Sequence, residues 1–76
     1  MESNGGNDKN VTILTNKILA GMEAMREGAT LDLPEYRLMI TRSRQHYILF
    51  TSGELHYTSS LAGARKFVRK QIKKTN

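Results

Sequence analysis

Residues 36–58, YRLMITRSRQHYILFTSGELHYT, decide the fold, because they contain three β-strand patterns separated by two short polar turns. Apolar and polar residues alternate over 36–42, as expected for a strand with one buried face. Residues 46–51 are apolar on both faces, which favours a central strand. Residues 54–58 alternate again after Ser52-Gly53, a pair typical of a tight hairpin turn. Strands joined by such short turns predict an antiparallel meander.

Upstream of this region, residues 30–33 also alternate briefly, with Leu31 and Leu33 on one side. Pro34 follows at once and has no N–H to donate to a strand ladder. We therefore expect three strands rather than four.

Downstream, residues 58–76 read TSSLAGARKFVRKQIKKTN and predict an amphipathic helix. Leu61, Ala64, Val68 and Ile72 recur at steps of three and four, which places them on one stripe. The Thr-Ser-Ser segment supplies hydroxyls to cap the helix start. The opposite face carries two rows of cations and no acid: Arg65, Arg69 and Lys73, then Lys66, Lys70 and Lys74.

Residues 11–27 predict the other helix, since Val11, Leu14, Ile18 and Met22 recur at helical spacing. Gly28 is well placed for a left-handed residue after its end. Residues 1–10 are polar and predict a mobile tail, so residues 11–76 form the single small domain. The predicted class is α+β with the order α-β-β-β-α: a three-stranded antiparallel sheet, two helices on one face and the other face open.

Charge is distributed unevenly along the 76 residues, whose net charge is +5. Residues 1–36 hold three basic and six acidic residues, a net of −3, whereas residues 37–76 hold nine basic residues and only Glu54, a net of +8. Such asymmetry indicates a polyanionic partner for the second half. The alternative is attraction between oppositely charged halves of one chain or of two chains.

We therefore expect a small basic protein that binds nucleic acid, DNA or RNA, through phosphates and with little sequence specificity. The candidate contacts are Arg37 on a strand, Arg42 and Arg44 in the first hairpin turn, and Arg65, Lys66, Arg69, Lys70, Lys73 and Lys74 on the last helix. The helix N-terminus near Leu61 and Ala62 is a further candidate phosphate site. The structural alternative to nucleic-acid binding is that these cations form a solvated face, with their aliphatic stems covering a thin core.

Two other functions fit the same residues. One is an interaction module, of the compact inhibitor or adaptor kind that phages and plasmids encode, whose basic face docks on an acidic protein. The other is a homodimer formed through the open sheet face or an edge strand. On the open face, tyrosines are candidates for stacking unpaired bases, and the sequence does not decide between this role and core packing for Tyr47 and Tyr57.

Catalytic chemistry finds little support in the sequence, and we expect no enzyme and no cofactor. His46, His56 and Glu54 are the only candidate metal ligands, and polar residues on a strand surface explain them without a metal. No cysteine is present, which excludes disulfides and thiolate chemistry. The chain has no long apolar run and a polar N-terminus, so we expect no membrane span and a cytoplasmic location.

Overall fold

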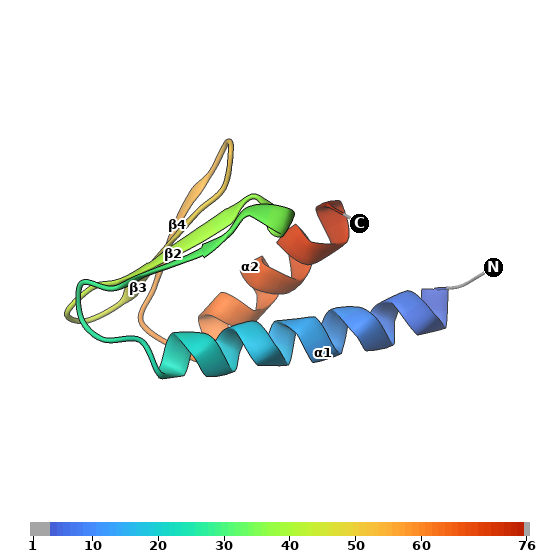
Figure 1. Ribbon diagram of the computed structural model, residues 1–76, viewed down its shortest axis with the longest axis horizontal. Coiled ribbons are helices and arrows are strands. Elements are labelled where there is room, and N and C mark those ends of the chain that lie inside the picture. The colour runs from blue at the N-terminus through green and yellow to red at the C-terminus, as the bar shows by residue number, and fades with distance from the viewer. Residues whose placement is uncertain (1–3, 76) are drawn as a thin grey trace.

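The computed structural model describes residues 4–75, in which two helices pack on one side of a four-stranded antiparallel sheet (Figure 1). The elements are, in chain order, α1 (Asn4–Glu23), β1 (Thr30–Leu33), the 3-10 turn η1 (Pro34–Tyr36), β2 (Leu38–Arg42), β3 (Tyr47–Phe50), β4 (Leu55–Thr58) and α2 (Leu61–Lys74). The predicted α+β class is confirmed, whereas the predicted number of three strands is wrong.

The additional strand is β1, which pairs antiparallel with β2 from Thr30 opposite Thr41 to Leu33 opposite Leu38. Pro34 lies just beyond the last pair and opens η1, where its missing N–H removes no bond from the ladder. The strands lie in the order β1-β2-β3-β4, so β1 is an edge strand. Pro34 therefore ends this strand and does not prevent it.

The same turn shortens the next strand, which was expected to begin at Tyr36 and begins at Leu38. Arg37 adopts a left-handed conformation, φ 51° and ψ 44°, and its N–H donates to the Pro34 carbonyl at 3.1 Å. The prediction that Arg37 lies on a strand is wrong, because this residue completes the reversal between β1 and β2.

The remaining strands form the predicted meander. Ile40 of β2 lies opposite Leu49 of β3, and Leu49 lies opposite His56 of β4. Backbone hydrogen bonds close both hairpins: Ser43 N–H donates to the His46 carbonyl at 2.7 Å, and the N–H of residue 51 donates to the carbonyl of residue 54 at 2.9 Å. The two short turns read from the sequence are therefore confirmed.

Helix α1 starts and stops earlier than expected. It begins at Asn4 rather than at residue 11, so much of the segment predicted to be a tail is helical, and residues 1–3 lie outside the described residues. It ends at Glu23, where the Met22 carbonyl accepts both the Tyr47 hydroxyl and the Met25 N–H at 3.1 Å. The helix therefore ends next to the carbonyl that accepts the hydrogen bond from Tyr47 of β3, and the loop begins there.

Gly28 turns the chain from this loop into β1. Its φ of 85° belongs to the left-handed region, as predicted, but Gly28 does not cap α1, because that helix already ends at Glu23. Its N–H donates to the Arg42 carbonyl at 2.8 Å, and the Arg42 N–H donates to the Ala29 carbonyl at 3.0 Å. The glycine thus starts the pairing of β1 with β2.

The core lies between the helices and the sheet. The predicted stripe of α2 is confirmed, because Ala64, Val68 and Ile72 are completely buried. Buried residues of α1, β2 and β3 complete the cluster: Val11, Ile18, Leu19, Met22, Leu38, Ile40, Tyr47 and Leu49. Gln71 is also buried, and its Nε2 donates to the Tyr36 carbonyl at 2.7 Å, which ties the end of α2 to η1.

Two helical glycines differ in the space around them. A Cβ on Gly21 would lie 3.6 Å from Leu31 Cδ2, an ordinary van der Waals contact. A Cβ on Gly63 would overlap Thr58 Oγ1, which is held in place by hydrogen bonds with the backbone of Ser60. Gly63 is therefore required by close approach of β4, whereas Gly21 is not.

We expect Gly21→Ala to stabilise the protein by about 0.5–1 kcal/mol, because alanine is the better helix former. Gly63→Ala should instead destabilise it by about 1–3 kcal/mol through overpacking. Urea unfolding of both variants measures the two effects. The cost of Gly63→Ala should fall in a Thr58→Ala background, and an unchanged cost there would contradict the assigned contact.

Candidate nucleic-acid interface

Helix α2 is held to the sheet by a two-residue connection and a side-chain cap. Ser60 has extended backbone angles, and its Oγ accepts the Gly63 N–H at 3.0 Å, which satisfies one free donor of the first turn. With Ala64, Val68 and Ile72 facing the core, the opposite face of the helix points away from the sheet. The cations of α2 therefore lie on its flanks and outer face.

Two of these cations contact α1. Arg65 Nη2 donates to Asn16 Oδ1 at 2.9 Å, and Arg69 Nη1 donates to Thr12 Oγ1 at 2.9 Å. The Arg69 bond is partly buried, and the Arg65 bond is exposed. Both arginines join the two helices, a role that no local pattern in the sequence indicates.

The four lysines of α2 lie in two settings. Lys73 and Lys74 belong to the last turn, where positive charge is favourable next to free carbonyl groups, and Lys74 Nζ lies 3.9 Å from Glu54 Oε1. Lys66 and Lys70 lie in the middle of the helix and are exposed. Among the described residues, no acid pairs with Lys66 or Lys70. The other cations of α2 are placed by a hydrogen bond to α1, by an ion pair or by the helix end. Among the described residues, none of these explains the positions of Lys66 and Lys70.

The other three candidate residues lie away from this helix face. Arg42 is at the end of β2, with its guanidinium carbon 4.5 Å from the centre of the Tyr47 ring. Arg44 is in the β2–β3 hairpin, with Nε 3.7 Å from Glu27 Oε2 in an exposed pair. Arg37 is at the opposite end of β2. The structure thus gathers the α2 residues and leaves these arginines as separate groups.

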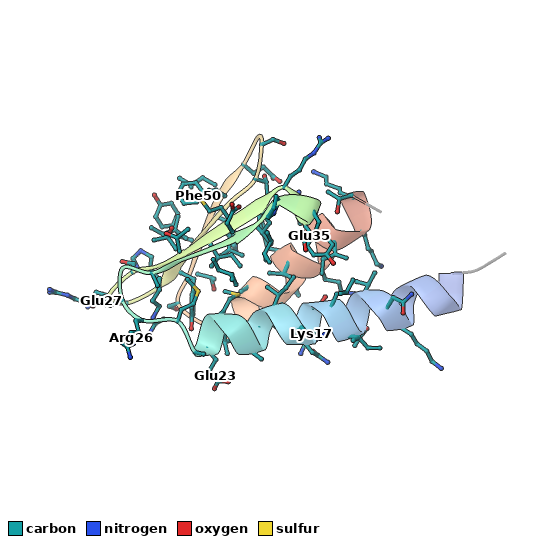
Figure 2. All side chains as sticks on the ribbon, in the orientation of Figure 1. Lys17, Glu23, Arg26, Glu27, Glu35 and Phe50 are labelled. Carbon is teal, nitrogen blue, oxygen red and sulfur yellow. The ribbon has the colours of Figure 1, made fainter. Side chains whose placement is uncertain are left out.

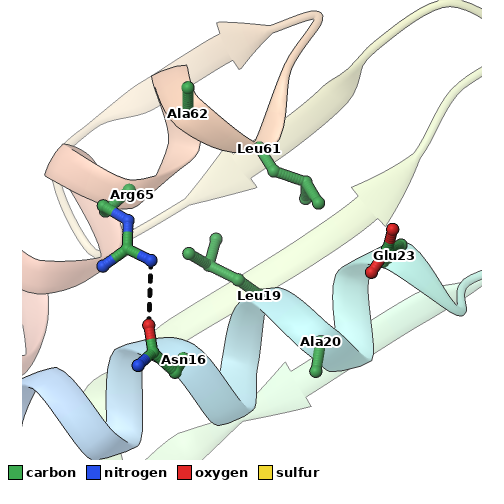
Figure 3. A pocket seen from close by; sticks show the side chains of 7 residues that line it. All are labelled: Asn16, Leu19, Ala20, Glu23, Leu61, Ala62 and Arg65. Atoms are coloured by element: carbon green, nitrogen blue, oxygen red, sulfur yellow. Dashed lines mark hydrogen bonds between the residues drawn. The ribbon is translucent and has the colours of Figure 1, made fainter.

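A groove lies between α1 and the first turn of α2 (Figure 3). Leu19 and Leu61 line it, Arg65 and Asn16 form its hydrogen-bonded end, and Glu23 is also part of its wall. The negative charge of this carboxylate repels a phosphate and so opposes the attraction that the helix N-terminus exerts. This groove is therefore a poorer phosphate site than the lysines of the outer face.

The two histidines lie in different surroundings. The His46 ring is 5.6 Å from that of Tyr57, on the open side of the sheet, whereas His56 stacks on Phe67 of α2 at 4.8 Å. Among the side chains that the structure describes, those of residues 9–75, no three from His, Asp or Glu form a group suited to a metal ion. None of the described helices is long and apolar enough to cross a membrane.

The open face of the sheet forms a second surface. Met39, Phe50, Leu55 and Tyr57 are 42%, 38%, 50% and 57% exposed. In Figure 2, Phe50 lies on the side of the sheet away from α1. Tyr47 faces the core instead, with 6% exposure, so it packs in the core, whereas Tyr57 lies on the open face.

Comparisons of this chain with protein-family models, with curated proteins and with solved structures gave no match.

The hydrogen bonds between the helices predict unequal losses of stability. In a double-mutant cycle, Thr12→Val and Arg69→Met should show a coupling energy of about 1 kcal/mol, since a partly buried bond from a charged donor is lost. The cycle of Asn16→Ala with Arg65→Met should show less, because that bond is exposed. Denaturant unfolding measures both, and equal or reversed couplings would contradict the assignment.

Proposed function

We propose that this protein binds nucleic acid through the phosphate backbone and that the outer face of α2 makes the contact. The observation that carries the proposal is the position of Lys66 and Lys70, exposed in the middle of a helix without acids and unpaired by any described residue. Lys73 and Lys74 extend the same cationic surface toward the helix end. This is a binding role and not a catalytic one.

The geometry favours a duplex over a single strand. Residues 66–74 span about 12 Å of helix, since an α-helix rises about 1.5 Å per residue. A DNA duplex presents about one negative charge per 1.7 Å of its axis, so several phosphates come within reach of one short helix. The aromatic residue of α2, Phe67, is half-buried against His56, which leaves no aromatic ring on the outer face of α2 for stacking on unpaired bases.

The arginines have different parts in this proposal. Arg65 and Arg69 hold α2 against α1, and their remaining N–H groups flank the lysines. Arg37, Arg42 and Arg44 lie at the two ends of β2 and its hairpin, and a long or bent nucleic acid would be needed to reach them as well. We therefore assign the primary contact to the four lysines.

The proposal predicts a specific dependence on salt. Four phosphate contacts give a slope of log K against log salt of about −3.6 for B-DNA, and Lys66→Gln with Lys70→Gln should reduce its magnitude by about 1.8. Glutamine is nearly as good a helix former as lysine, so α2 should stay folded. Fluorescence polarisation with labelled duplexes and single strands of DNA and RNA, over a range of salt, gives these slopes.

The matched control replaces two exposed lysines of α1, Lys9→Gln with Lys17→Gln, which removes the same charge from a different helix face. Lys17 points away from the body of α1 in Figure 2. The control should keep the wild-type slope. Equal loss in both variants would show that net charge alone drives binding. No binding of wild type at low salt would contradict the proposal and favour an acidic protein as the partner of these lysines.

A further inference from the structure

The open face of the sheet has the composition of a contact surface. Side chains from alternate positions of the four strands point away from the helices and form two rows across the sheet: Asp32, Met39, Phe50 and Leu55 in one, and Thr30, Thr41, Ile48 and Tyr57 in the other. The β3 and β4 part of both rows is entirely apolar or aromatic, and the β1 part is polar. An apolar centre with a polar margin is the usual anatomy of a protein interface.

Charge on this face contrasts with charge on the rest of the molecule. Asp32 is the only charged residue in the two rows, and Arg37 borders the same face, beside Met39 and Phe50. These two opposite charges cancel, in a chain whose net charge is +5. A face without net charge does not attract a polyanion, and two identical faces of this kind do not repel one another.

We propose that this sheet face binds a second copy of the chain, so that two sheets pack face to face in a symmetric dimer. The excess positive charge favours this arrangement over other contacts between copies. Packed sheets lie about 10 Å apart and each helix layer about 10 Å further out, which puts the two α2 helices roughly 30 Å apart. That separation is about three Debye lengths at 0.1 M salt, so repulsion between the cationic helices is screened.

The size of the face sets the strength of the dimer. Four strands about 4.8 Å apart and four residues of about 3.3 Å each give a footprint of roughly 19 by 13 Å. A standard stable interface buries about 800 Å² per partner, which is more than this footprint supplies. The dimer is therefore weak and reversible. The dimer does not depend on nucleic-acid binding, and both α2 helices remain on its outside.

The test is sedimentation velocity of the full chain from about 10 μM to about 1 mM, a range that covers weak association. The apparent mass should rise from that of the 8.6 kDa chain toward twice that value. Raising the salt should strengthen the association or leave it unchanged, whereas phosphate binding weakens with salt. A wild-type monomer over the whole range would overturn the proposal.

Two variants make the test specific. Leu55→Lys places a charge in the apolar centre at a residue that is 50% exposed, so the fold should survive, and it should abolish the rise in mass. Ile13→Lys makes the same change on α1, where Ile13 is 56% exposed outside the sheet face, and should behave as wild type. Dimerisation retained by Leu55→Lys, or lost in Ile13→Lys, would overturn the proposed surface. Leu55→Lys should still bind nucleic acid, which separates this proposal from the one above.

Discussion

The burial of one stripe of α2 against the sheet is the contact on which the rest of the structure depends. Ala64, Val68 and Ile72 are completely enclosed, and they fix the rotation of the helix about its own axis. In a chain of 76 residues the core is thin, and few other residues can replace this burial. Every other property of α2, including which cations meet α1 and which meet solvent, follows from that rotation.

A single layer of helices on a single sheet leaves the molecule with two unlike outer surfaces. One is the helix layer, where the lysines of α2 lie. The other is the open sheet face, where Phe50, Leu55 and Tyr57 are exposed and almost no charge is present. The helix layer is suited to contact with an anion, and the open sheet face is suited to contact with an apolar surface. These two contacts would involve different residues.

Local patterns were sufficient for much of this structure. The helical spacing of Leu61 to Ile72 and the hydroxyl of Ser60 act over a few residues, and the structure has both the stripe and the cap. The two short hairpins were likewise determined by neighbouring residues. Strand β1 was missed because the effect of Pro34 depends on its position in the ladder, one residue past the last pair, and sequence alone does not give that register.

Features that depend on distant partners were not predictable in this way. Arg69 and Thr12 are 57 residues apart and Arg65 and Asn16 are 49 apart, so no local pattern revealed that these arginines connect the helices. The apolar character of residues 46–51 on both faces favoured a central strand, and β3 does lie between β2 and β4. The two helices cover only one side of the sheet. Phe50 and Ile48 therefore lie on the uncovered side.

The contact between α1 and α2 also has a consequence for how the chain folds. The four strands pair only with neighbours in sequence, so each hairpin closes a short loop at small entropic cost. The two helices, in contrast, bring together the beginning and the end of the chain, and this long closure is rewarded only after the sheet has formed a surface on which both helices can pack. From this topology we expect the meander to form first and α1 to dock beside α2 in a later step.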